Sequence, residues 1–407
     1  MSFRRRGEVV PGRGIPVGNP MLQRTPAVAS APGIAPNRMV RPTKPTKQED
    51  STFKHPGVKP SIVLSNVYCV STGSKDIDTV LVHGGLPVNQ TLLIEEDGST
   101  DFSGVLVKNY VSEGIVQNRR GGKVVNHCIV VGMDASFGNE LSDVYAGNSK
   151  ERKKKLVQEN EGKLSVSNIT NSANDLKIAW RYRKDIQGSG KRDVSENDDE
   201  SKYPEYNHQF DITTKIRPSP GPNEITYIPV SGGYETVLRN VRQTVERELK
   251  DVSKMVRIVV PYFLNPMVYG CGQYVSYDEV VRFVFGLKRI VNMYNGRATL
   301  IANMSSELYE DTDVLNILHD TLFDGVIRLV PFPHELNTLM EKVYKTQREK
   351  IKQGYVDIYK VPILSGLGMM EKRLKEYSFK NGKTSFHVEQ WSIPVDEEEV
   401  DEKKVDF

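Results

Sequence analysis

Short apolar runs alternate with helical periodicity along most of this chain, from about residue 61 to residue 393. A continuous apolar run without a regular polar position is typical of a strand that is buried on both faces. A spacing of three and four between apolar residues instead predicts an amphipathic helix. We therefore predict strands over 61–70, 91–95, 127–133, 256–261, 297–303, 325–331, 355–362 and 384–393, and helices over 103–114, 233–255, 277–294, 312–322 and 335–345.

The alternation of strands and helices predicts an α/β fold. Strand–helix–strand order favours right-handed crossovers and a mainly parallel sheet flanked by helices. The last two predicted strands alternate apolar and polar residues over part of their length, as strands with one solvated face do. Asn381-Gly382 lies just before the final strand and predicts an antiparallel hairpin, so the sheet is expected to be mixed.

Three segments carry too few apolar residues to pack into this domain. Residues 1–59 form a basic stretch rich in proline and glycine, which predicts a disordered tail. Residues around 185–204 read as a flexible, charged insertion, and residues 396–407 as an acidic tail. The ordered α/β domain is accordingly expected to cover residues 60–395.

Composition excludes several classes of protein. The net charge of +3 is small for 407 residues, so any contact with RNA should be local. Cys69, Cys128 and Cys271 are widely spaced and odd in number, which argues against a disulfide framework and favours the cytoplasm and nucleus. No apolar run reaches the length of a membrane span, and the basic N-terminus is not followed by the apolar region of a secretory signal.

The most informative segment is Ser71–Ser103, which has the order of elements found at the start of a RecA- or KaiC-type ATPase domain. A Ser-Thr-Gly turn is followed by acidic residues, a Gly-Gly-Leu-Pro turn, an apolar strand and a strand-to-helix loop. Each feature alone is weak, and their shared order carries the similarity. The matching positions are Ser71, Thr72, Gly73, Asp76, Ile77, Asp78, Leu81, Gly84, Gly85, Leu86 and Pro87.

The strand-to-helix loop stands where such an ATPase has its phosphate-binding P-loop. A functional P-loop has glycines that allow close approach to phosphate and a lysine that contacts the β- and γ-phosphates. Here Phe102 stands at the lysine position and Asp101 at the last glycine, and Glu95, Glu96, Asp97 and Asp101 make the surroundings negative. We predict that this degenerate loop does not bind ATP in the usual way and that Phe102 packs inward. The loop comprises Glu96, Asp97, Gly98, Ser99, Thr100, Asp101, Phe102 and Ser103.

The position of the magnesium ligand is altered as well. An ATPase of this type places an aspartate at the end of the strand predicted over 256–261, where this chain has Pro261. Neither a Ser/His/Asp set nor a metal-ligand spacing stands out, and the sequence predicts no catalytic residue, no metal site and no cofactor bound by the chain's own loop. The spacing of metal ligands is absent among four of the histidines: His83, His127, His208 and His387.

Four further segments carry a resemblance to a known family. They are DLKIAWRYR (175–183), YNHQFDITTKI (206–216), VRIVVPYFLNP (256–266) and FKNGKTSFHVEQWSIPVD (379–396). Together with the degenerate RecA-like start, they resemble the Elongator complex subunit 4 family over essentially all of residues 60–396. The opening MSFRRRGEV is similar to a fungal member of that family.

The resemblance implies a function that the residues alone do not give. It implies a RecA-like subunit without Walker motifs, which is not itself an enzyme and forms a hetero-hexameric ring with the paralogous Elongator subunits 5 and 6. The ring would bind tRNA and join the catalytic subassembly of subunits 1, 2 and 3. The complex modifies the wobble uridine, U34, with carbonylmethyl-type groups such as that of 5-methoxycarbonylmethyl-2-thiouridine. Any ATP would lie at ring interfaces and be held by neighbouring subunits.

Two other hypotheses remain open from the sequence. One is a RecA- or KaiC-like ATPase whose nucleotide site is completed in trans by a neighbour, with this chain supplying an arginine. The candidate donors are Arg181, Arg183, Arg257 and Arg282. The other is a DNA-repair recombinase paralogue, against which the lack of an N-terminal DNA-binding domain argues.

The RNA-contacting residues are not determined by the sequence. One candidate is the loop after Pro261, with Asn265 and the Gly270-Cys271-Gly272 turn, although its glycines could simply serve a tight turn. The other is the basic stretch Arg152, Lys153, Lys154 and Lys155, for which a solvated run of charge is the simpler interpretation.

Overall fold

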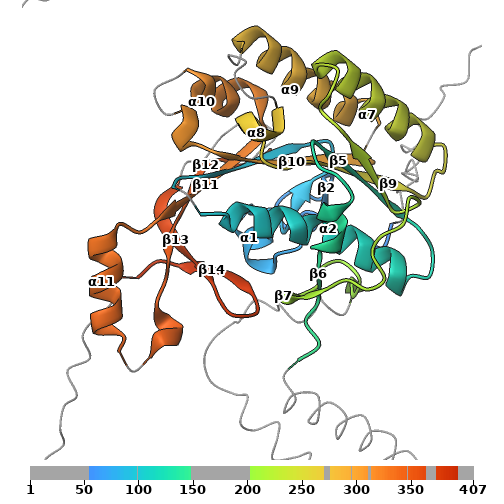
Figure 1. Cartoon of the computed structure of the whole chain (residues 1–407). Helices are drawn as coiled ribbons and strands as arrows, with labels where there is room; N and C mark the ends of the chain where they lie inside the picture. The colour runs from blue at the N-terminus through green and yellow to red at the C-terminus, as the bar shows by residue number, and fades with distance from the viewer. Residues whose placement is uncertain are drawn as a thin grey trace, which may run out of the picture. The chain divides into compact units, whose positions relative to one another are not determined.

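A nine-stranded sheet organises the part of the chain that the computed structural model describes, in the order β14-β13-β12-β11-β4-β10-β9-β5-β8 (Figure 1). The described residues are 55–98, 100–147, 202–269, 276–294, 296–309, 313–345, 347–363 and 373–392. They all belong to one compact unit, Phe53–Phe407. The sheet strands are β4 (Thr91–Glu96), β5 (Asn126–Val131), β8 (Ile225–Ile228), β9 (Met255–Val260), β10 (Ala298–Ser305), β11 (Gly325–Pro331), β12 (Gly354–Lys360), β13 (Arg373–Asn381) and β14 (Phe386–Gln390).

The sheet is parallel through its centre and antiparallel at one side. Strands β11, β4, β10, β9, β5 and β8 pair in parallel, and every residue of β4, β5 and β9 is buried. Strands β12, β13 and β14 extend this sheet by antiparallel pairing. These findings confirm the predicted fold class of a mainly parallel, mixed α/β sheet, including the antiparallel hairpin that follows Asn381.

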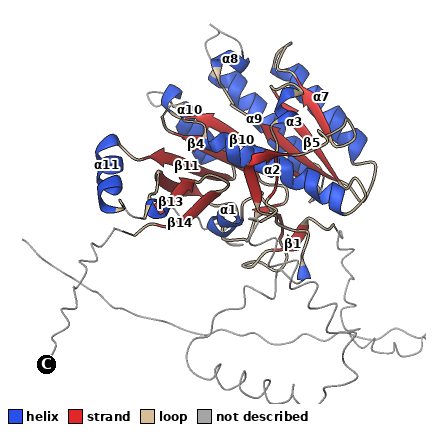
Figure 2. Cartoon of the chain, turned by 60° about the horizontal axis from the view of Figure 1, so that its bottom comes forward, coloured by secondary structure: helices blue, strands red, loops and turns tan. Residues whose placement is uncertain are grey.

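Helices cover both faces of the sheet (Figures 1 and 2). One face carries α1 (Lys75–Val80) and α2 (Phe102–Arg120), and the other carries α7 (Tyr234–Glu248), α9 (Tyr277–Asn292) and α10 (Val314–Ile317), which continues as a π-helical turn over Leu318–Leu322. The shorter elements are β1 (Val58–Pro60), β2 (Tyr68–Val70), β3 (Leu86–Pro87), α3 (Ser136–Asn139), β6 (Ser142–Val144), β7 (Phe210–Lys215), α8 (Pro266–Tyr269), η1 (Glu307–Tyr309), α11 (His334–Val343) and η3 (Arg348–Lys350).

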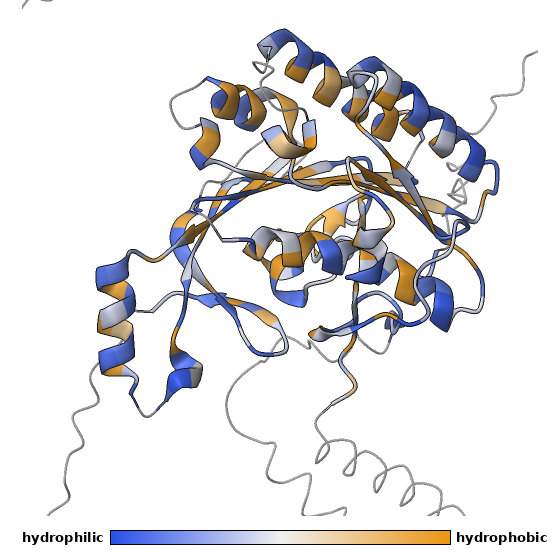
Figure 3. Cartoon of the chain, in the orientation of Figure 1, coloured by the Kyte–Doolittle hydropathy of each residue, from blue (hydrophilic) through white to orange (hydrophobic). Residues whose placement is uncertain are grey.

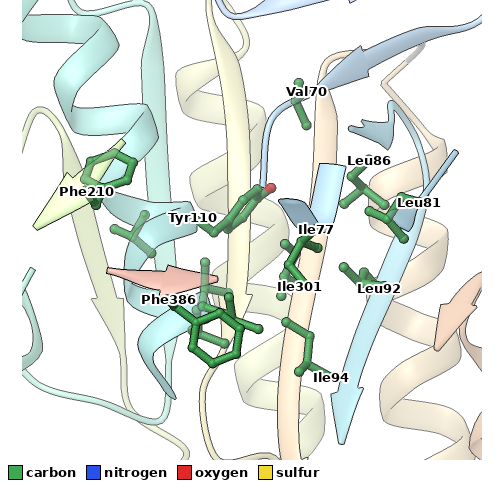
Figure 4. Packing of buried hydrophobic residues seen from close by; sticks show 14 of the residues in the cluster. Val70, Ile77, Leu81, Leu86, Leu92, Ile94, Tyr110, Phe210, Ile301 and Phe386 are labelled. Atoms are coloured by element: carbon green, nitrogen blue, oxygen red, sulfur yellow. The ribbon is translucent and has the colours of Figure 1, made fainter. Parts of the chain in front are cut away.

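The alternation of side chains along β4 divides the interior into two cores. Leu92 and Ile94 point toward α1 and α2, whereas Leu93 belongs to the core beneath α7 and α9. The first core is shown from close by in Figure 4, where Ile94 and Ile301 lie in the same cluster as Phe386 of β14. Figure 3 shows apolar colour along the sheet and polar colour on the outer sides of α7 and α9, as expected for amphipathic helices.

Three element predictions were wrong in informative ways. The segment 61–70 is not one strand, because Ser61 Oγ accepts hydrogen bonds from Val63 N and Leu64 N and turns the chain before β2 begins. The helix predicted over 233–255 ends at Glu248, where a turn leads into β9. Strand β13 was not predicted, since its burial pattern lacks both a continuous apolar run and a regular alternation.

Several predictions concern residues outside the described part of the chain. These are the disordered tail 1–59 up to residue 54, the insertion 185–204 up to residue 201, and the acidic tail 396–407. Within the described ranges, no helix is long and apolar enough to cross a membrane.

Candidate functional site

The degenerate P-loop lies at the carboxyl end of β4, between two parallel neighbours. β10 and β11 flank β4, and the chain passes from Glu96 at the end of this strand to Phe102 at the start of α2. The carboxyl edge of an open parallel sheet is the usual place for ligands in α/β proteins, and the N-terminus of a long helix favours anions there. The predicted loop is therefore in the expected position.

The carboxylate of Glu96 fills this loop. Glu96 is 2% exposed, and its Oε1 accepts hydrogen bonds from Phe102 N at 2.9 Å and Thr100 Oγ1 at 2.6 Å. Its Oε2 accepts a hydrogen bond from Ser103 N at 2.8 Å. Two consecutive backbone amides at the start of α2 are thus satisfied by a side chain of the preceding strand, in place of a helix cap or a ligand.

Phe102, at the position of the P-loop lysine, packs inward as predicted. Its ring meets that of Phe379 on β13 edge to face, with 5.0 Å between ring centroids, and Phe379 stacks on Phe386 of β14 at 5.6 Å. The side chain that would contact phosphate in an ATPase instead joins α2 to the antiparallel side of the sheet. This contact uses the favoured edge-to-face geometry of aromatic rings.

The other acidic residues around the loop are largely compensated. Glu95 is completely buried and pairs with Arg328 Nε at 2.9 Å and His319 Nε2 at 2.5 Å. Asp97 accepts a hydrogen bond from Ser306 Oγ and lies 3.7 Å from Arg328 Nε. The negative charge expected around the loop is therefore partly neutralised at these two residues by Arg328 of β11, which the sequence did not place here.

Asp101 completes the loop on its outer side. Its Oδ2 accepts a hydrogen bond from Tyr262 Oη at 2.9 Å, and burial raises the pKa of this carboxyl group above its usual range, although the Tyr262 hydrogen bond opposes the shift. Gly104 leaves no room for a side chain, since a Cβ there would lie 2.4 Å from Asp101 Oδ1. Asp101 is thus held against the first turn of α2.

The end of β9 has no acidic group in the position of a magnesium ligand. After Pro261, Tyr262 adopts a positive φ of 51°, and its backbone N–H donates to Asn303 Oδ1 at 3.0 Å. Asn303 Nδ2 in turn donates to Ser103 Oγ at 2.9 Å. Uncharged amide and hydroxyl groups therefore connect the ends of β9 and β10 to α2. In the described part of the chain, no group of three or more His, Cys, Asp or Glu side chains could hold a metal ion.

The Ser-Thr-Gly turn is held together by Asp78. Its Oδ1 accepts hydrogen bonds from Thr72 N and Thr72 Oγ1, both at 2.7 Å, and its Oδ2 accepts from Ser71 Oγ at 2.7 Å and from Asn207 Nδ2 at 2.6 Å. Burial raises the pKa of Asp78 to about 6 despite these hydrogen bonds. Gly73 is required at this turn, since its φ is +80° and a Cβ would lie 2.3 Å from the Asn109 carbonyl oxygen. The motif serves the architecture of the turn.

The structure argues against Arg257 as the arginine donated to a neighbour's nucleotide site, because this side chain is buried. Arg257 is fully buried on β9, where its Nη1 donates to Ser71 O at 2.9 Å and its guanidinium lies over the Tyr110 ring at 4.7 Å. Arg282 lies on the surface of α9 and pairs with Asp278 at 2.8 Å. Arg181 and Arg183 fall outside the described residues, as do the 270–272 turn and the basic stretch 152–155.

One juxtaposition was missed in the sequence. Ser385 Oγ lies 2.6 Å from His387 Nε2, and His387 Nδ1 lies 3.6 Å from Asp76 Oδ2. Asp76 Oδ2 also accepts the Val388 N–H at 2.9 Å and so fastens α1 to the outer edge of β14. All three side chains border an open groove of about 860 Å³ beneath α1. The wide separation of Asp76 from Ser385 along the chain left no signal for this cluster.

These observations define a class of protein: an α/β domain with the strand, loop and helix of a P-loop fold, in which the chain's own side chains close the loop. Comparison with known sequences gives the family. The family model described as PAXNEB protein matches residues 51–406. Elongator complex protein 4 of Saccharomyces cerevisiae is 36% identical over 98% of this chain and 93% of its own length. The proteins of the same name from Schizosaccharomyces pombe and Homo sapiens are 24% and 25% identical, over 83% and 84% of this chain and 88% and 80% of their own lengths. The chain belongs to the Elongator complex subunit 4 family.

Proposed function

We propose that this protein is a non-catalytic subunit of the Elongator complex. It would assemble with the subunit 5 and 6 paralogues into a hetero-hexameric ring and join the catalytic subassembly of subunits 1, 2 and 3. The ring would bind tRNA and support modification of the wobble uridine in the cytoplasm and nucleus. Membership of the subunit 4 family supports the assembly, since its curated relatives carry the name of this complex.

The closed loop is the observation that carries the non-catalytic role. Glu96 occupies the amides that would face a phosphate, and Phe102 packs on Phe379 where a lysine would contact the γ-phosphate. Just after the end of β9, Tyr262 N donates a hydrogen bond to Asn303 of β10, where an ATPase has a carboxylate ligand for magnesium. These three substitutions in one site support a loop that does not hold a nucleotide and its metal. Nucleotide in the ring would belong to sites held by its neighbours.

The alternative is an ATPase whose site is completed between subunits, with this chain as the donor of a catalytic arginine. Arg282 is the described candidate with an exposed side chain, and its partner Asp278 is equally accessible. Exposed ion pairs of this kind are weak and exchange readily. Replacement of Arg282 by alanine would then lower ATP turnover of the assembled complex at least about tenfold, whereas the non-catalytic role predicts no change.

The first test is the native mass of the purified assembly. The full chain is co-expressed with its two proposed paralogues, and mass is measured by light scattering or native mass spectrometry. A discrete six-subunit species that contains all three chains and binds tRNA supports the proposal. A stable monomer, or a homo-oligomer that excludes both paralogues, contradicts it.

A further inference from the structure

Glu96 occupies a defined position in the P-loop pattern. The pattern begins and ends its loop with glycines and continues with Lys and then Ser or Thr. With Phe102 at the lysine position and Ser103 after it, the first glycine falls at residue 96. A glycine there leaves space for the phosphate, whereas here a carboxylate extends into that space and reaches the two amides.

The charge of Glu96 is held without a cation. Glu96 is 98% buried, and among the described residues no lysine, arginine or histidine nitrogen lies within 4.0 Å of its carboxylate. Burial of an unpaired carboxylate is costly unless hydrogen bonds and dipoles replace the lost water. Its neighbour Glu95, which is also buried on β4, instead pairs with the side chains of Arg328 and His319. Two buried carboxylates in sequence are therefore stabilised by different means.

The donors around Glu96 are those of an anion site. They are the N–H groups of Phe102 and Ser103 and the hydroxyl of Thr100, at 2.9, 2.8 and 2.6 Å. Both amides belong to the first turn of a 19-residue helix, whose dipole favours a negative charge there. The two carboxylate oxygens each take one amide, as two oxygens of a bound phosphate would.

We propose that Glu96 is a built-in anionic ligand that occupies the phosphate position and keeps the loop closed. The contact makes the fold of the loop independent of nucleotide and blocks the entry of a phosphate group. Removal of the Glu96 side chain leaves an anion site of the same donors, which takes a small carboxylate or inorganic phosphate. This inference goes beyond the proposed role in assembly and stands whether or not the chain forms a ring.

The test is chemical rescue of the full chain. Thermal unfolding midpoints are compared for the wild type, Glu96→Ala and Glu140→Ala in chloride, formate and phosphate at equal ionic strength. Glu140 is the control because it is an acid on the surface, 57% exposed and paired with Lys108, and its removal changes the net charge equally. We expect Glu96→Ala to unfold roughly 5 °C below the wild type in chloride and to regain at least about 2 °C in formate or phosphate beyond the control.

A neutral variant separates charge from shape. Glu96→Gln fills the same space but presents an amide, so it should lose stability in chloride and gain nothing specific from formate or phosphate. Folding of Glu96→Ala only in the presence of these anions would also support the proposal. An equal response to all three salts in Glu96→Ala and Glu140→Ala would overturn it, as would a Glu96→Ala midpoint equal to that of the wild type in chloride. The native mass of the co-expressed assembly is read separately, so a failure of ring formation is not confused with a failure of this inference.

Discussion

Asp78 is a buried carboxyl group whose ionisation depends on its place in the fold. It lies in α1, fully enclosed, and accepts four hydrogen bonds from Ser71, Thr72 and Asn207. These hydrogen bonds favour the charged form, but burial outweighs them and raises the pKa from 3.8 to about 6. A carboxyl group that is easier to protonate in the folded state than in the unfolded state makes stability fall as the pH rises.

We predict a specific pH dependence from this shift. The contribution of Asp78 is fully present below about pH 4, where both states are protonated, and is lost as the pH rises through about 6. Between pH 5 and pH 7.5 the wild type should lose on the order of 1 kcal/mol of unfolding free energy relative to Asp78→Asn, which does not titrate. Urea unfolding at the two pH values measures this difference. A constant difference between the two proteins across this range would show that Asp78 keeps an ordinary pKa.

At the scale of elements, Phe102 connects α2 with the antiparallel strands. Its edge-to-face contact with Phe379 joins the first turn of the helix to β13, and Phe379 carries the contact on to β14. Residue 102, which would contact phosphate in an ATPase, therefore serves packing in this protein. One side chain cannot serve both packing and phosphate binding, because a lysine that reached a phosphate would have to leave the aromatic cluster.

We predict that Phe102→Lys weakens the fold without restoring ATP binding. Loss of the aromatic contact and partial burial of an ammonium group should cost about 2 kcal/mol or more in unfolding free energy, whereas Phe102→Leu should cost roughly 1 kcal/mol. Glu96 still occupies the phosphate position in both variants, so neither should bind ATP in equilibrium dialysis. Measurable ATP binding by Phe102→Lys would show that the lysine alone decides the affinity and that Glu96 yields to phosphate.

The sequence predicted the central elements because burial leaves a strong local pattern. β4, β5 and β9 each contain a run of at least three apolar residues, and β11 has the predicted bounds, Gly325–Pro331. β13 was missed because pairing with β12 and β14, more than its own residues, defines it as a strand. The sequence of the loop also showed directly that Phe102 replaces the lysine.

The sequence did not predict that Glu96 fills the site. That contact depends on the three-dimensional path of the loop, which brings the amides of residues six and seven positions further along the chain to the Glu96 carboxylate.

At the scale of the whole molecule, the open sheet ends in two strands, β14 and β8. An exposed sheet edge offers unpaired backbone groups to another chain unless it is covered. Among the described residues, Asp76 of α1 accepts the Val388 N–H at this edge, and Thr384 O, just before β14, accepts the Ile212 N–H. Because β14 lies at the edge of the sheet, we propose this edge as the contact with the next subunit of the proposed ring.

Hydrogen exchange tests this arrangement across the chain. In the isolated protein, amides of β4, β9 and β10 should exchange slowest, because these strands are buried in the centre of the sheet with partners on both sides. Amides of β14 should exchange faster, since this strand lies at the sheet edge and, within the described residues, pairs with a strand on one side only, β13. In the co-expressed assembly we expect β14 to gain at least about tenfold protection while the central strands stay unchanged, as measured by mass spectrometry of peptides that cover Phe386–Gln390.

The proposed contact edge would be wrong if protection rose instead at β8 or over the outer surface of α9, where Phe285 is 60% exposed. Either pattern would identify the surface by which this subunit meets its neighbour, because the same experiment follows peptides from β14, β8 and α9.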